Sequence, residues 1–219
     1  MYVCANSKRL AFSSEVRALA QAGFASQEPD PDAVSSYLSW GSISGPRTVL
    51  ADVRELDPGS YLEYKQGAWS IARWWKPEVD ADEALGGDAE RLVRAALKDS
   101  VSRHLVADRP VGVFLSGGVD SSAVASVAAA EGQLRALTVT FPGTGEDEGD
   151  AAASIAQHLG AAHEDVPVTG AEVESDLPNI MSAMDQPTAD GVNSWIISKA
   201  AHDAGLVVAL SGLGGDELF

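Results

Sequence analysis

Basic residues and cysteines are scarce in this chain of 219 residues. Its 15 lysines and arginines stand against 32 aspartates and glutamates, and the formal net charge is -17. A field of that sign repels polyanions, so the composition argues against general nucleic-acid binding. The single cysteine, Cys4, cannot form an internal disulfide. The sequence also shows neither a secretory leader nor a run of about 18 apolar residues that could cross a membrane. We therefore expect a cytoplasmic protein without nucleic-acid or membrane partners.

The first 80 residues predict a small region rich in turns. Two pairs of short alternating segments, within residues 2–12 and 60–75, predict β-hairpins. A short helix is expected at residues 15–22. A longer one begins at Asp30-Pro31, because proline lacks an amide hydrogen that the first helical turn could not use. The acidic stretch at residues 78–88, which contains two glycines, is typical of a hinge.

Beyond this stretch the pattern changes to alternating helices and strands. Strands are predicted at residues 111–115, 137–141, 164–168 and 207–210, of which the first and the last are apolar runs. Helical spacing is found at residues 92–105, 121–130, 151–159, 173–184 and 193–204. Strands without polar alternation, separated by helices, need both faces of their sheet covered. We therefore predict an α/β fold with a doubly wound, Rossmann-like parallel sheet that binds its ligand at the carboxyl ends of the strands.

A glycine-rich loop, SGGVDS at residues 116–121, follows the first of these strands and leads into a helix. Glycines let the main chain turn tightly and approach a ligand, and the amides of a helix N-terminus attract anions. The carboxylate of Asp120 would repel a bare phosphate, so its presence makes sense chiefly if Mg²⁺ bridges it to phosphate oxygens. The pattern indicates ATP with Mg²⁺, and the alternative is an ordinary glycine turn capped by serine.

A second loop, SGLGGDE at residues 211–217, follows the last predicted strand. It is not a dinucleotide fingerprint, because Glu217 stands where a third glycine would be needed. Its place at the end of an apolar strand indicates approach to a different anion or ring, and the alternative is a solvent-facing acidic turn.

The first loop resembles the pyrophosphate loop of the ATP pyrophosphatases, and the second resembles the second nucleotide motif of the asparagine synthetase and β-lactam synthetase family. Further stretches match the glutamine-dependent (class B) asparagine synthetase family in the same order: FSSE at residues 12–15, GPRT at 45–48, LDPG at 56–59 and RWWKP at 73–77. The resemblance covers nearly the whole chain. It implies the end of a glutaminase domain at residues 1–24, a connector with a hairpin at 25–80, and a synthetase domain of adenine nucleotide α-hydrolase-like fold at 81–219.

The resemblance also assigns site residues. ATP would be bound by Leu115, Ser116, Gly117, Gly118, Asp120, Ser121, Ser122, Val139, Ser211 and Gly212. Mg²⁺ would be held by Asp120 and Asp216, and the catalytic set would be Asp120, Ser116 and Ser121. A substrate-side role is implied for Asp185, Asp190, Gly215 and Glu217, with a plain turn as the alternative at residues 185–190. The acidic residues 146–148 fall where the family carries an acidic pair, and a solvated helix cap is the alternative there.

The reaction that the resemblance implies is ATP-dependent amide formation. A carboxylate, aspartate in the parent family, attacks the α-phosphorus of ATP, and pyrophosphate leaves. Ammonia derived from glutamine then displaces AMP from the acyl adenylate. The family's glutaminase uses an N-terminal cysteine, whereas Cys4 follows three residues within an apolar segment, so we expect an inert packing thiol. The full-length protein could form a homodimer on the same resemblance.

Two departures from the family leave the product open. Leu213 stands where asparagine synthetases often carry an acidic residue that assists proton removal from ammonia. The chain also ends at Phe219, before the lysine that contacts pyrophosphate in the family, so we expect a fragment that binds ATP weakly and forms no amide. The alternatives are an amidotransferase or a β-lactam synthetase-like enzyme acting on another carboxylate, a tRNA-modifying relative, which the acidic composition disfavours, and a nucleotide-binding module without turnover.

Overall fold

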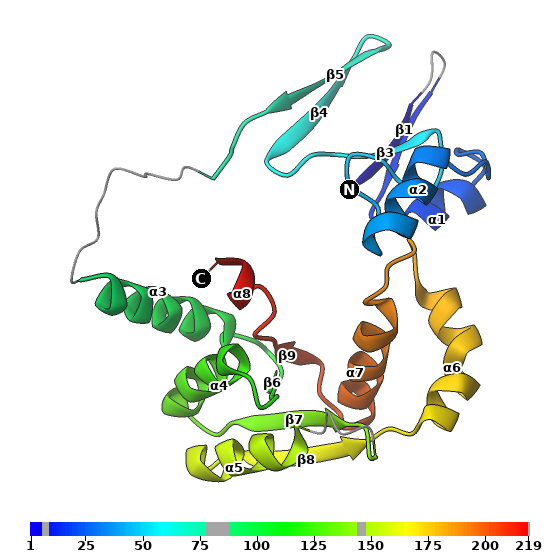
Figure 1. Cartoon of the computed structure of the whole chain (residues 1–219). Helices are drawn as coiled ribbons and strands as arrows, with labels where there is room; N and C mark the ends of the chain where they lie inside the picture. Colours follow the sequence, from blue (N-terminus) through cyan, green and yellow to red (C-terminus); the bar gives the residue numbers. More distant parts are fainter. Residues whose placement is uncertain (6–8, 78–87, 144–147, 219) are drawn as a thin grey trace. The chain divides into compact units, whose positions relative to one another are not determined.

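The computed structural model of the chain describes residues 1–5, 9–77, 88–143 and 148–218, without the side chains of the last two. The predicted hinge therefore lies outside the described residues, apart from Asp88. The chain forms two compact units, and the colours of Figure 1 identify the residues of each unit by their numbers. The first unit comprises Met1–Asp82 and Pro178–Ser194, and the second comprises Glu83–Leu177 and Trp195–Phe219.

A three-stranded antiparallel sheet lies at the centre of the first unit. In spatial order its strands are β2 (Leu10–Ser13), β1 (Tyr2–Ala5) and β3 (Val53–Glu55). The hairpin of β1 and β2 confirms the prediction, whereas β3 is too short to show a period-two pattern. Helix α1 (Val16–Gln21) buries Val16 and Leu19 against Cys4 and Val53. This cluster is the core of the unit.

Helix α2 (Pro31–Trp40) begins where the sequence predicts it. The carboxylate of Asp30 accepts a hydrogen bond from the amide of Asp32 at 2.9 Å and so satisfies a donor of the first turn. The helix ends at Gly41, whose φ of 70° lies in the left-handed region that glycine adopts without strain.

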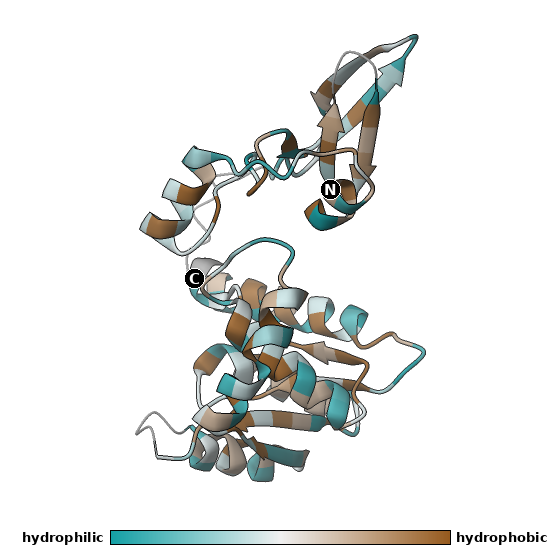
Figure 2. Cartoon of the chain, turned by 90° about the vertical axis from the view of Figure 1, so that its right-hand side faces the viewer, coloured by the Kyte–Doolittle hydropathy of each residue, from teal (hydrophilic) through white to brown (hydrophobic). Residues whose placement is uncertain are grey.

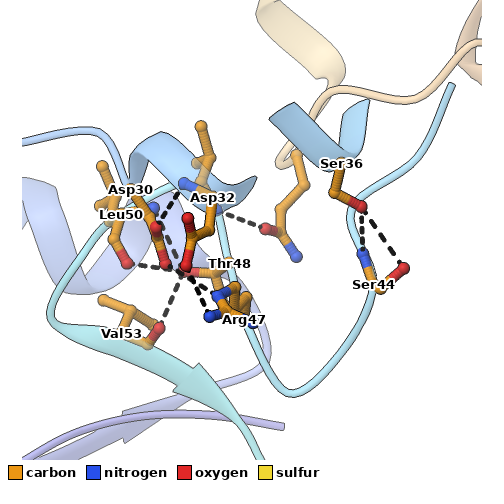
Figure 3. Close-up of polar contacts among 10 residues, drawn as sticks. Asp30, Asp32, Ser36, Ser44, Arg47, Thr48, Leu50 and Val53 are labelled. Carbon is orange, nitrogen blue, oxygen red and sulfur yellow. Dashed lines mark hydrogen bonds and ion pairs between the residues drawn. The ribbon is translucent and has the colours of Figure 1, made fainter. Parts of the chain in front are cut away.

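The GPRT stretch at residues 45–48 builds part of this unit, as Figure 3 shows. The guanidinium of Arg47 donates to the carboxylate of Asp32 at 2.7 Å and lies 3.6 Å from that of Asp30. The side chain of Thr48 is fully buried, and its hydroxyl donates to the carbonyl oxygen of Val53 at 3.0 Å. These contacts join the start of α2 to β3.

A second hairpin, of β4 (Ser60–Lys65) and β5 (Ala68–Arg73), follows as predicted. Its turn uses Gln66 and Gly67, both with positive φ. Positive φ at both central residues suits the twist of a two-residue hairpin turn.

The second unit contains a four-stranded parallel sheet. In spatial order its strands are β8 (Ala162–Pro167), β7 (Arg135–Thr140), β6 (Val111–Phe114) and β9 (Val208–Leu210). Apolar residues, brown in Figure 2, recur along these strands. The strands β6 and β9 are neighbours, so the two glycine-rich loops that follow them leave the same edge of the sheet.

Helices cover both faces of this sheet, which confirms the doubly wound α/β prediction. The covering helices are α3 (Ala89–His104), α4 (Val119–Glu131) and α5 (Gly149–Leu159) on one face and α7 (Gly191–Asp203) on the other, while α6 (Gly170–Ala183) precedes α7 in the chain. On one face Val113 and Leu115 pack with apolar residues of α3, α4 and α5. On the other face Leu137 packs with Ala200 and Ala201 of α7. Among the helices that the structure describes, none has the length and apolar character needed to span a membrane.

Candidate nucleotide site

Serine hydroxyls shape the loop between β6 and α4. The amide of Ser116 donates to the hydroxyl oxygen of Ser121 at 3.1 Å, and the two hydroxyls lie 2.8 Å apart. The amide of Gly118 donates to the hydroxyl of Ser116 at 3.1 Å, and the hydroxyl of Ser122 donates to the carbonyl of Gly118 at 2.6 Å. The predicted catalytic serines therefore hold the conformation of the loop, with Ser121 itself buried.

A buried polar chain holds the residue before the loop. The amide of Leu115 donates to the carbonyl of Leu137 at 2.9 Å, and the hydroxyl of Thr138 donates to the carbonyl of Leu115 at 2.7 Å. The Nε2 atom of His163 lies 2.8 Å from the same hydroxyl. Because the single hydroxyl hydrogen is used on Leu115, the imidazole must be the donor in this second bond.

Sequence reasoning missed this chain of contacts. It predicted a strand at residues 137–141 and gave no functional role to the threonines of that strand or to His163. The available signal was the pair of threonines in the run LTVT, since both Thr138 and Thr140 are buried and buried hydroxyls require partners.

The second loop lies directly against the start of α4. An added Cβ at Gly212 would lie 2.5 Å from the amide nitrogen of Ser121 and 2.8 Å from the carbonyl carbon of Asp120. A Cβ at Gly215 would collide with the carboxylate of Asp120. Both glycines are therefore needed for a close approach of the two loops. The geometry places the main chain that leads into Asp216 beside Asp120.

Two carboxylates near this junction are the predicted ligands of magnesium. Within the described ranges, no group of three or more His, Cys, Asp and Glu side chains is arranged to hold a metal ion. Mg²⁺ in nucleotide sites is usually held by one or two carboxylates together with phosphate oxygens and water. Asp120, in the first turn of α4, and Asp216, in helix α8 (Gly215–Leu218), could provide such a pair. A full protein cage is not required.

One residue of the predicted acidic trio contacts the first loop. Glu148 accepts a hydrogen bond from the amide of Gly117 at 3.1 Å through its carboxylate. The other two members, Glu146 and Asp147, lie outside the described residues. The contact was not predicted, because the two residues stand 31 positions apart in the sequence.

The remaining predicted ATP contacts surround the same edge of the sheet. Val139 lies in β7 and packs partly buried against the core of the second unit. The hydroxyl of Ser211 accepts a hydrogen bond from the amide of Leu213 at 3.1 Å, while the Leu213 side chain is 86% exposed. The side chain of Glu217 lies outside the described part of the chain, so its predicted substrate role stays a prediction.

Asp185 has a structural partner in the first unit. Its two carboxylate oxygens accept hydrogen bonds from the amides of Val16 and Arg17 at 2.7 and 2.9 Å. Glu15 stands at the N-cap position of α1 but makes no side-chain cap, so Asp185 satisfies these donors from a distant part of the chain. The next residue, Gln186, accepts from the amide of Val49 at 2.9 Å.

Asp190 also makes local contacts. Its carboxylate accepts a hydrogen bond from the hydroxyl of Ser194 at 2.9 Å, one turn into α7. The structure thus shows capping contacts for Asp185 and Asp190, while their substrate-side role stays a prediction. Both belong to the first unit, whereas the two glycine-rich loops belong to the second.

Cys4 has the surroundings of a packing residue. Its side chain is 5% exposed, and the thiol donates to the carbonyl of Phe24 at 3.2 Å. Burial, with a smaller contribution from Asp52, raises the pKa of the thiol above its usual 9.0. A protonated thiol is a poor nucleophile, in agreement with the expected inert role.

Two neighbouring strands of the parallel sheet end in glycine-rich loops that pack closely together, so the chain is an α/β protein whose candidate site lies at the carboxyl edge of its sheet. The chain belongs to the asparagine synthase family, whose model matches residues 92–219. A model described as a glutamine amidotransferase domain matches residues 1–75.

Curated relatives agree with this assignment. Asparagine synthetase [glutamine-hydrolyzing] 1 of Bacillus subtilis is 34% identical over 196 residues, which cover 88% of this chain and 31% of that protein. A putative glutamine-hydrolyzing asparagine synthetase of Mycobacterium tuberculosis is 34% identical over 200 residues, covering 88% of this chain and 30% of that protein. The chain therefore spans somewhat less than a third of the length of these relatives.

Among solved structures, the chain has a weak similarity to a synthetase. An NH3-dependent NAD synthetase from Campylobacter jejuni has a TM-score of 0.39 and 16% identity, over 55% of this chain and 54% of its own.

Proposed function

We propose that the second unit binds ATP with Mg²⁺ and serves as the adenylating part of an amide-forming ligase. The observation that carries the proposal is the close packing of Gly212 and Gly215 on residues 120–121, which brings the second loop to the carboxylate of Asp120. The family relatives named as glutamine-hydrolyzing asparagine synthetases support the same reaction class.

The residues of the site would divide the work by chemistry. Main-chain amides of the first loop and of the start of α4 would donate to the departing pyrophosphate. The hydroxyls of Ser116 and Ser121 would keep those amides in position through the hydrogen bonds that they already make within the loop. Bound Mg²⁺ would neutralise phosphate charge, with Asp120 and Asp216 as its protein ligands.

The substrate is proposed as a carboxylate that attacks the α-phosphorus, with aspartate as the first candidate and ammonia from glutamine as the acceptor. The identity of Leu213 supports a second candidate function, an amidotransferase that acts on another carboxylate. Its exposed aliphatic side chain, in the second loop, cannot take a proton from ammonia. Residues 1–24 are proposed to be the end of the glutaminase part and residues 25–80 a connector, and the match of residues 1–75 to the amidotransferase model supports a glutaminase origin for the start of this region.

Isothermal titration of the chain with ATP, in the presence and absence of Mg²⁺, tests the nucleotide site. We expect weak binding that requires Mg²⁺ and that becomes at least about tenfold weaker, about 1.4 kcal/mol, in Asp120→Asn. Asp150→Asn is the matched control, because Asp150 lies in the first turn of α5 as Asp120 does in that of α4.

Equal ATP binding with and without Mg²⁺, or equal affinities of the two variants, would contradict the proposed site. Pyrophosphate release with aspartate and ammonia, compared with other carboxylates, distinguishes the two candidate substrates. Release that depends on a carboxylate other than aspartate would support the second candidate.

A further inference from the structure

Glu148 stands at the N-cap of α5 but does not cap its own helix. Its side chain instead reaches the loop between β6 and α4, where the carboxylate accepts the hydrogen bond from the Gly117 amide at 3.1 Å. The carboxylate of an N-cap residue usually accepts from amides two or three positions further on. The carboxylate of Glu148 is therefore bound by an amide of the first loop and not by the amides of its own helix.

The contact depends on close packing of the loop against α5. An added Cβ at Gly117 would lie 3.0 Å from the Cβ of Ala151 and 3.6 Å from that of Glu148. Only a residue without a side chain fits there without displacing the first turn of the helix. Gly117 and Glu148 are nevertheless both exposed, so solvent and ligands can reach their hydrogen bond.

The neighbouring amides of the loop have a different kind of partner. Those of Ser116 and Gly118 donate to serine hydroxyls of the loop itself. Gly117 donates to a carboxylate from outside the loop. A carboxylate oxygen and a phosphate oxygen accept hydrogen bonds from main-chain amides in the same way, and both carry negative charge.

We propose that Glu148 takes the place of a phosphate oxygen in the nucleotide-free loop and that it is displaced when Mg²⁺-bound phosphate arrives. This inference rests on the proposed function. The need to displace Glu148 lowers the affinity of the loop for phosphate, because only molecules in which the Gly117 amide has been released from Glu148 can bind. Binding of phosphate without a cation is disfavoured further, because the carboxylates of Glu148 and Asp120 then both repel the phosphate.

Titration with pyrophosphate and Mg²⁺, followed at the Gly117 amide by NMR, tests the proposal on the wild-type chain and on Glu148→Gln, Glu148→Ala and Asp150→Asn. We expect both Glu148 variants to bind roughly three- to tenfold more tightly than the wild type, with Ala at least as tight as Gln, because the glutamine keeps a weaker, neutral acceptor. Asp150→Asn removes the same charge from the same helix and should change the affinity less than about twofold, because exposed charges are screened.

A second readout needs no ligand. Without pyrophosphate, the Gly117 amide proton should shift in both Glu148 variants and stay in place in Asp150→Asn, because only the former lose the charged acceptor. Thermal unfolding of each variant verifies that it is folded.

The outcomes separate the two proposals. If the wild type binds and the Glu148 variants bind equally or more weakly, the displacement is wrong while the phosphate site stands, and weaker binding would make Glu148 a ligand of the cation. An unchanged Gly117 resonance in the free Glu148 variants also overturns it. If no form of the chain binds pyrophosphate, the proposed function and this inference both fail.

Discussion

Replacing Gly212 with alanine tests the contact between the two glycine-rich loops. The added Cβ would lie 2.5 Å from the nitrogen of Ser121, 2.8 Å from the carbonyl carbon of Asp120 and 2.9 Å from the Cα of Ser121. Favourable contacts between carbon atoms lie at about 3.5–4.0 Å, so the loops would have to separate by roughly 1 Å. All of these neighbours are main-chain atoms at the start of α4, which cannot rotate away as a side chain can.

Overpacking of this kind costs about 1–3 kcal/mol. For a protein of this length, that corresponds to a decrease in Tm of about 2–12 °C, at about 2–4 °C for each kcal/mol. Separation of the loops would also move Asp120 away from the second loop, so the Mg²⁺-dependent binding of ATP should weaken together with the stability.

Gly170→Ala is the matched control. An added Cβ at Gly170 meets nothing within 4 Å, and its φ lies outside the left-handed region. Removing a glycine from such a position usually stabilises by about 0.4–1 kcal/mol. Circular dichroism melts and titrations of both variants provide the comparison. A Gly212→Ala variant with the Tm and ATP affinity of the wild type would refute the close approach of the loops.

Two further predictions concern the first unit. Asp185→Ala should lower the free energy of unfolding by about 0.5–2 kcal/mol, because the cap of α1 is lost. Thermal denaturation should show little change for the exposed control Glu63→Ala, and equal melting of the two variants would contradict the capping role. The thiol of Cys4 should resist iodoacetamide at pH 8 in the folded chain and react readily in urea, because its pKa is raised in the folded state. The contribution of this thiol to stability is complete below the usual pKa of 9.0 and is lost as the pH rises through the raised pKa. Rapid alkylation of the native chain would contradict this prediction.

Much of the secondary structure could be predicted because its causes are local. The proline after Asp30 marks the start of α2, and the four strands predicted in the second unit correspond to β6, β7, β8 and β9. The ends of the elements differ by a few residues at most. Strand β3 could not be predicted, since three residues carry too little pattern and pair only with the distant β1.

In the candidate site, too, the local features could be predicted from the sequence and the contacts between distant residues could not. The two glycine-rich loops were recognised from short runs of sequence, and their position at the carboxyl ends of strands follows from the order of the elements. The contacts of their residues could not be predicted. Thr138 and His163 hold Leu115 from neighbouring strands, and Glu148 reaches Gly117 from another helix. A hydrogen bond between distant residues leaves no periodic signal in the sequence.

The sequence by itself determined the kind of fold, the two glycine-rich loops and the acidic character of the chain, because each depends on residue type and spacing within a few turns or strands. Only the tertiary structure decided that Asp185 caps α1 across 169 positions and that Gly212 and Gly215 lie against the start of α4 and Asp120. Such contacts arise when separate elements pack, and the identity of the partner is set by the path of the folded chain rather than by the neighbours of either residue.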